Sequence, residues 1–119
     1  MAKTILIAED DSFLQQMVAV SLEESGFTVI KANNGEQALK LLSSEKPDML
    51  LLDIMMPKVD GFDVLEHMKQ EKSKVPVIVM SNLGQESDIA KCKDLGAKDY
   101  VIKSDIEPGD LVQQVQKYM

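Results

Sequence analysis

Short apolar runs alternate with amphipathic stretches along the whole chain. A short apolar run bounded by polar residues is typical of a buried strand, whereas apolar residues repeated every three or four positions indicate a helix with one buried face. The apolar runs predict strands at about 4–8, 27–30, 49–52, 75–80 and 100–102. The helical spacing predicts helices at about 12–25, from Asn34 toward Pro47, around 61–68, at about 85–95 and from Pro108 onward.

Local signals at the helix ends refine these predictions. Asp11 or Ser12 and then Asn34 are suited to cap the first two helices, and Gly26 is suited to end the first one. Pro108 fits the first position of the last helix. The first helix is expected to turn four apolar side chains toward the core, those of Leu14, Met17, Val18 and Leu22.

Strands that alternate with helices predict an α/β fold, a doubly wound parallel sheet of five strands with helices on both faces. The chain has 119 residues, which suits one domain over 1–119. Sheets of this kind bind ligands at the carboxyl ends of their strands. The chain ends at Met119, soon after the last predicted helix, so we expect no output domain, and the sequence leaves open a stand-alone protein or an excised piece.

Composition excludes several classes of protein. The formal net charge is −7, and a chain of this sign repels the phosphate backbone of nucleic acids, so we expect no direct nucleic-acid binding. No apolar run approaches the roughly 20 residues of a transmembrane helix, and we expect no membrane association. The single cysteine, Cys92, cannot form an internal disulfide. It fits a reducing compartment, which favours a cytoplasmic location.

Polar residues follow four of the five predicted strands, and a parallel sheet would bring them to one rim. They are Glu9, Asp10, Asp53, Ser81 and Lys103. Two unit charges at 4 Å repel by about 4 kcal/mol at an effective dielectric constant of about 20, so clustered carboxylates favour a bound cation. Oxygen ligands without His or Cys favour Mg²⁺. The lysine and the serine hydroxyl suit an incoming anion, and the set as a whole indicates phosphoryl transfer to a carboxylate.

The segment Asp53-Ile54-Met55-Met56-Pro57-Lys58-Val59-Asp60-Gly61 resembles the signature around the phosphoacceptor aspartate of response regulator receiver domains. Four further positions fit the same family. Glu9-Asp10 resembles its acidic metal pair, Ser81 its hydroxyl position, Lys103 its lysine and Tyr100 its aromatic switch position. The resemblance covers the whole chain and implies the flavodoxin-like strand order 2-1-3-4-5, for which the chemotaxis receiver is a standard example.

The resemblance also implies roles. Asp53 would carry the phosphoryl group, and Mg²⁺ would be bound by Glu9, Asp10, Asp53 and the Met55 carbonyl. Ser81 and Lys103 would bind phosphoryl oxygens, and Ser81 with Tyr100 would form the switch. A sensor histidine kinase or a phosphotransfer protein would supply the phosphoryl group. A downstream protein would bind the face made by the fourth helix, the fifth strand and the last helix.

This reading makes the chain a signalling domain rather than an enzyme, able to phosphorylate itself from small donors and to lose the group slowly. Slow loss is expected because Met55 and Leu83, which border the path of the attacking water in the family, are apolar and cannot orient that water. Two departures stand out. Ser104 replaces the usual proline after the lysine, where a cis bond would cost about 2.5–4 kcal/mol, and Asn82 replaces a usually small residue.

Other interpretations remain. Glu9 and Asp10 could serve only the dipole of the first helix, and Tyr100 could be plain strand packing. A phosphohydrolase with an aspartyl-phosphate intermediate is opposed by Met55, because such enzymes usually have a second acid two residues after the nucleophile. A pseudo-receiver is opposed by the complete set of acids, hydroxyl and lysine. Flavin binding is opposed by the acids that follow the first strand, which would repel a phosphate.

Overall fold

The computed structural model describes residues 3–56, 58–82 and 85–119. Its parallel sheet has the order β2-β1-β3-β4-β5, as predicted. The strands are β1 (Thr4–Ala8), β2 (Thr28–Ala32), β3 (Met49–Asp53), β4 (Val77–Ser81) and β5 (Asp99–Ile102). The helices are α1 (Ser12–Glu24), α2 (Gly35–Glu45), α3 (Gly61–Gln70), α4 (Glu86–Asp94), the short 3-10 helix η1 (Lys103–Asp105) and α5 (Pro108–Lys117).

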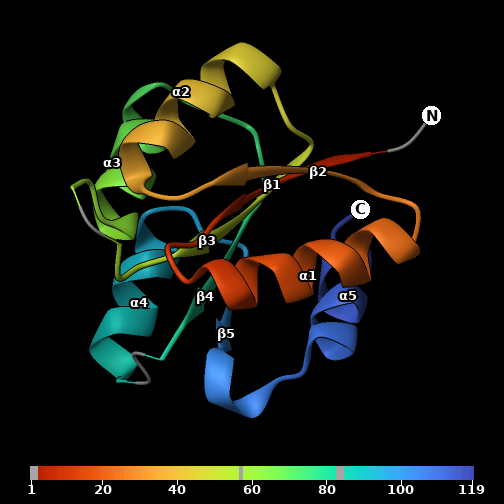
Figure 1. The fold of residues 1–119 in the computed structure, drawn as a ribbon. Helices are drawn as coiled ribbons and strands as arrows, with labels where there is room; N and C mark the ends of the chain where they lie inside the picture. Colours follow the sequence, from red (N-terminus) through yellow and green to blue (C-terminus); the bar gives the residue numbers. More distant parts are fainter. Residues whose placement is uncertain (1–2, 57, 83–84) are drawn as a thin grey trace.

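Helices cover both faces of the sheet. α1 and α5 lie on one face, while α2, α3 and α4 lie on the other (Figure 1). Side chains of a strand alternate between the two faces, so Ile5 and Ile7 pack under α1 and α5, whereas Leu6 and Ala8 pack under α2 and α3. All five residues of β3 are buried, as befits a central strand covered on both sides.

The predicted ends of the helices are largely confirmed. Asp11 is the N-cap of α1, and its carboxylate accepts hydrogen bonds from the backbone N–H groups of Phe13 and Leu14. Asn34 caps α2, and its side-chain oxygen accepts from the N–H of Gln37 at 2.9 Å. Gly26 follows the end of α1 with φ of +96°, a left-handed conformation that glycine adopts without steric cost.

Two predictions are wrong, one about the buried face of α1 and one about the first residue of β4. Met17 is 40% exposed, because at about 100° per residue it lies roughly opposite the buried stripe of α1. That stripe consists of Gln15, Val18, Ala19 and Leu22. The fourth strand begins at Val77 rather than at 75. Pro76 has no N–H to donate, although its carbonyl still accepts a hydrogen bond from the N–H of Leu50 in β3 at 3.0 Å.

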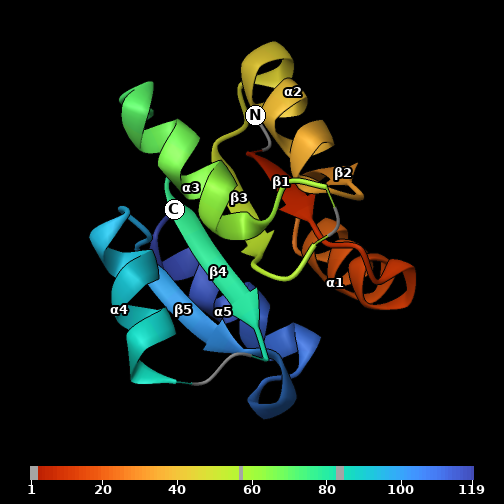
Figure 2. The same cartoon turned by 90° about the vertical axis from the view of Figure 1, so that its left-hand side faces the viewer.

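The edge strand β5 has α4 on one side and α5 on the other (Figure 2). The pairing of β5 with β4 places Tyr100 beside Val79 and Ile102 beside Ser81. None of the helices in the described part of the chain is both long and apolar enough to cross a bilayer.

Candidate functional site

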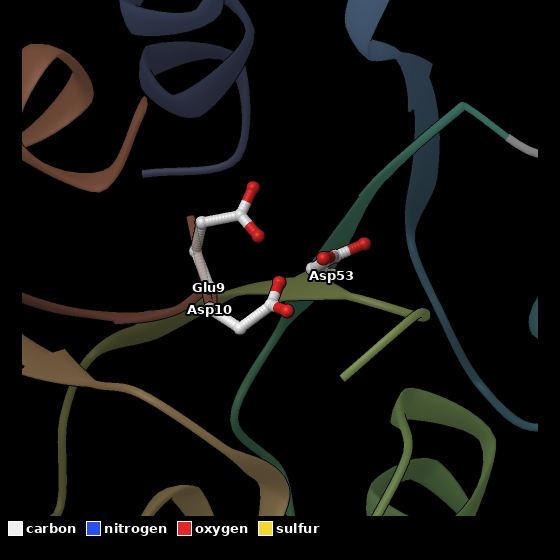
Figure 3. A group of neighbouring side chains, drawn as sticks. All are labelled: Glu9, Asp10 and Asp53. Carbon is white, nitrogen blue, oxygen red and sulfur yellow. The ribbon is translucent and has the colours of Figure 1, made fainter. Parts of the chain in front are cut away.

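The carboxyl ends of β1, β3, β4 and β5 bring polar side chains to one rim of the sheet. Glu9 and Asp10 follow β1, Asp53 is the last residue of β3, and Ser81 is the last residue of β4. Lys103 follows β5 directly, as the first residue of η1. Figure 3 shows Glu9 and Asp10 at the end of β1, with Asp53 beside them on β3.

The three acids form a tight cluster. One carboxylate oxygen from each of Glu9, Asp10 and Asp53 lies within 4.8 Å of the others. Glu9 is completely buried and Asp53 is 2% exposed, whereas Asp10 is exposed. The cluster is therefore buried on its protein side and open to solvent at Asp10.

Lys103 supplies a positive charge to the two buried acids. Its ammonium nitrogen lies 3.1 Å from Asp53 Oδ2 and also forms an ion pair with Glu9 Oε1. Burial alone would lower the pKa of Lys103, but the contacts with Glu9 and Asp53 outweigh it and raise the pKa above its ordinary value. The side chain therefore stays charged at neutral pH.

Lys103 offsets only part of the effect of burial on the Glu9 carboxylate. Burial, followed by the contact with Asp53, raises the pKa of Glu9 to about 8, while Lys103 acts in the opposite direction. Both carboxylate oxygens of Glu9 are buried and lack a well-aligned hydrogen-bond donor among the described residues. Buried oxygens of this kind, beside two further carboxylates, fit a hard cation such as Mg²⁺.

The loop after β3 contacts Asp53 through its backbone. The N–H of Met55 donates to Asp53 Oδ1 at 3.2 Å, and Met55 is 60% exposed. The N–H of Gly61, at the start of α3, donates to the Ile54 carbonyl at 2.9 Å. A Cβ on Gly61 would lie 2.6 Å from the Asp53 carbonyl oxygen, so only glycine permits this close approach.

Ser81 and Tyr100 meet at the same end of the sheet. Ser81 is fully buried, and Tyr100 is half-buried against the core under α3 and α4. Burial raises the pKa of the Tyr100 hydroxyl, and a side-chain hydrogen bond with Ser81 acts in the opposite direction. The two residues predicted to form a switch therefore contact each other.

Ser104 and Asn82, the two residues that differ from the usual pattern of the family, are both in the described part of the chain. The described chain contains no cis peptide bond, so the bond between Lys103 and Ser104 is trans and Lys103 starts η1. Asn82 is exposed. Leu83, predicted to shield the site, lies outside the described residues.

Sequence reasoning missed one residue that supports the acids. Gln15 of α1 is 6% exposed, and its side-chain amide donates a hydrogen bond to the backbone carbonyl of Glu9. A polar residue on a helix is usually taken as solvent-facing, so its type argued against burial. Its position in the same stripe as Val18, Ala19 and Leu22 could have revealed it.

A doubly wound sheet with acids, a hydroxyl and a lysine at one rim defines the class of signal receiver domains. A family model described as the response regulator receiver domain matches residues 5–116. The chain therefore belongs to the response regulator receiver domain family.

Individual relatives agree. Over 103 residues, 87% of this chain, the sequence is 39% identical to the alkaline phosphatase synthesis transcriptional regulatory protein PhoP of Bacillus subtilis. It is 33% identical over 121 residues to the phosphate regulon transcriptional regulatory protein PhoB of Escherichia coli, a match that covers 100% of this chain. The chain spans only 43% and 52% of these two relatives.

Solved structures include a similar receiver domain. The receiver domain of the Francisella response regulator 1452 superposes with a TM-score of 0.92 at 28% identity, over 98% of this chain and 95% of that one. The chain is thus similar to receiver domains of two-component systems in both sequence and structure.

Proposed function

We propose that residues 1–119 form a single receiver domain in which Asp53 accepts a phosphoryl group from a histidine kinase or a phosphotransfer protein. The observation that carries the proposal is the placement of the Asp53 carboxylate. It ends a central strand, lies 3.1 Å from the Lys103 ammonium and belongs to the cluster with Glu9 and Asp10. An aspartate carboxylate can act as the nucleophile and form an aspartyl phosphate, and the neighbouring ammonium group is suited to stabilise the transferring phosphoryl group.

In the proposed reaction an oxygen of Asp53 forms a bond to phosphorus while the bond from phosphorus to the donor atom breaks. The product is an aspartyl phosphate, and the electron pair leaves with the donor. Lys103 and the Ser81 hydroxyl would bind the phosphoryl oxygens, and their charge and hydrogen bonds would stabilise the transferring group. Glu9, Asp10, Asp53 and the Met55 carbonyl would hold Mg²⁺. When bound, the ion would neutralise charge on the acids and on the phosphoryl oxygens.

The proposed output depends on Ser81 and Tyr100. A phosphoryl group on Asp53 would draw the Ser81 hydroxyl toward it and change the contact between Ser81 and Tyr100. That change would reach the face formed by α4, β5 and α5, where we propose that a downstream protein binds. The phosphoryl donor and this partner would be met in the cytoplasm, without direct binding to nucleic acid or to a membrane.

The proposed function is tested by intact mass. The protein is incubated with Mg²⁺ and a small phosphodonor, and parallel samples contain EDTA or the variant Asp53→Asn. We expect the wild-type protein to gain one phosphoryl group and both parallel samples to gain none. Equal uptake by Asp53→Asn would remove Asp53 from the role of acceptor.

The lifetime of the phosphoryl group should depend on Met55. Met55 lies two residues after Asp53 and is 60% exposed, and its side chain cannot orient a water for in-line attack. We expect slow loss of the phosphoryl group in the wild type, and several-fold faster loss in Met55→Asn combined with Leu83→Glu. The decay of the phosphorylated mass gives the rates, with Met55→Leu as the apolar control. A double variant that is no faster would refute the shielding by these side chains.

The switch should be visible in backbone amide NMR. On phosphorylation we expect shifts at the Asp53 rim, over 81–95 and over 100–104, because the Ser81–Tyr100 contact connects the rim to β5 and α4. A sample of Asp53→Asn treated in the same way serves as the control. Changes confined to 27–45, at the opposite edge of the sheet from β5, would rule out the α4–β5–α5 face.

A further inference from the structure

The side chain of Gln15 is buried close to the acids, although none of the roles above uses it. Helical side chains point back toward the N-terminus, and this one reaches the end of β1. Its Nε2 atom lies 3.1 Å from the Glu9 carbonyl oxygen and 2.9 Å from the Ala32 carbonyl oxygen. It also lies 3.3 Å from Asn33 Oδ1. With three oxygens around it, this position can be filled only by the amide nitrogen.

The first of these hydrogen bonds holds the peptide group that joins Glu9 to Asp10, and the second ties the same amide to β2. The last paired residue of β1 is Ala8, opposite Ala32, and the N–H of Glu9 still donates to the Ala32 carbonyl at 3.0 Å. The carbonyl of Glu9 lies beyond this ladder and is held by Gln15 instead. Because this peptide group joins the Cα atoms of the two residues, its orientation sets the direction in which their side chains leave the chain. Figure 3 shows the Glu9 and Asp10 side chains leaving the end of β1.

Asp10 depends on this support more than the other two acids. Glu9 and Asp53 are buried and paired with Lys103, so packing and charge fix them. Asp10 is exposed, and its carboxylate is placed mainly by the backbone that carries it. A backbone held on one side by β2 and on the other by α1 keeps that carboxylate within reach of Asp53.

We infer that Gln15 is a positioning residue for the Glu9–Asp10 pair, and that its amide sets the affinity of the site for Mg²⁺. This inference rests on the Mg²⁺ site of the proposed function. Hydrogen-bond partners of metal ligands typically change metal affinity by about 10–100-fold when they are removed. The inference therefore predicts a measurable loss of Mg²⁺ affinity from a residue that does not touch the ion.

The test compares three variants by calorimetric titration with Mg²⁺ alone, after amide NMR has shown that each is folded. Gln15→Met keeps the volume of the side chain and removes both N–H donors. Gln15→Arg restores N–H donors at the same position. Gln16→Met places the same substitution on the neighbouring exposed residue of α1. We expect about tenfold weaker binding in Gln15→Met, recovery of most of this loss in Gln15→Arg, and wild-type binding in Gln16→Met.

Two results would overturn the inference while leaving the proposed function intact: Mg²⁺ affinity of Gln15→Met within twofold of the wild type, or an equal loss in Gln15→Met and Gln15→Arg. A wild-type protein that binds no Mg²⁺ would overturn both. The wild type alone gives a second measurement in case Gln15→Met does not fold. The side-chain amide protons of Gln15 should exchange slowly and shift as Mg²⁺ is added, and protons that exchange freely and do not shift would contradict the inference.

Discussion

Replacing Asp10 with alanine is expected to weaken Mg²⁺ binding by at least about tenfold, the lower end of the effect of losing even an indirect partner of a metal. Phosphorylation should be nearly abolished. The Asp10 carboxylate shares the cluster with Glu9 and Asp53, and it is the acid open to solvent. Because its side chain is exposed, its loss should cost the fold little. Calorimetry measures the affinity, and intact mass measures the uptake of the phosphoryl group.

The neighbouring residue provides a matched control for Asp10→Ala. Asp11 is also an exposed acid, but it caps α1, and asparagine caps a helix about as well as aspartate. Asp11→Asn therefore removes a negative charge one residue away without disturbing the helix. We expect nearly unchanged Mg²⁺ affinity in this variant. Equal losses in the two variants would mean that general charge, rather than the position of Asp10, attracts the ion.

Replacing Gly61 with alanine should damage both stability and function. The new Cβ would lie 2.6 Å from the Asp53 carbonyl oxygen and 2.6 Å from the Ile54 Cα, and backbone atoms cannot rotate away as a flexible side chain can. Overpacking of this kind typically costs about 1–3 kcal/mol in the free energy of unfolding. The shift falls on the residue that carries the nucleophile, so phosphorylation should slow as well. Urea unfolding and intact mass measure the two effects.

Gly109 is the matched control for Gly61. It lies in the first turn of α5, and a Cβ there would meet nothing within 4 Å. Gly109→Ala should therefore leave phosphorylation unchanged and stabilise the protein by about 0.4–1 kcal/mol, through lower entropy of the unfolded chain. If Gly61→Ala were as stable as Gly109→Ala, the loop after β3 would have to be able to move away from α3.

The sequence predicts the fold well because the central strands β1, β3 and β4 are buried on both faces and appear as uninterrupted apolar runs. Met49 to Leu52 and Val77 to Met80 are examples. Surface helices give a weaker signal. The apolar type of Met17 predicts a core position, although the geometry of α1 places it outside. The polar type of Gln15 predicts a solvent-facing position, whereas its burial depends on carbonyl groups of Glu9 and Ala32 that come together only in the folded chain.

At the rim of the sheet, the sequence predicts which residues meet but not how they are paired. Parallel strands bring their carboxyl ends together whatever the side chains are, so the convergence of Glu9, Asp53 and Lys103 follows from topology alone. Lys103 pairs with both acids from the first residue of η1, next to a trans bond to Ser104. The cost of a cis bond before a residue other than proline favours the trans bond, but no local signal in the sequence indicates that Lys103 pairs with Glu9 as well as with Asp53.

The central claim is that Asp53 itself carries the phosphoryl group, and the most direct measurement is to locate that group chemically. Aspartyl phosphate is a mixed anhydride, and borohydride reduces it to an alcohol, which converts the aspartate into homoserine. After incubation with Mg²⁺ and a small phosphodonor, reduction and peptide mapping should find homoserine at position 53 and nowhere else. Homoserine at Asp10 or at another acid, with Asp53 unchanged, would contradict the account.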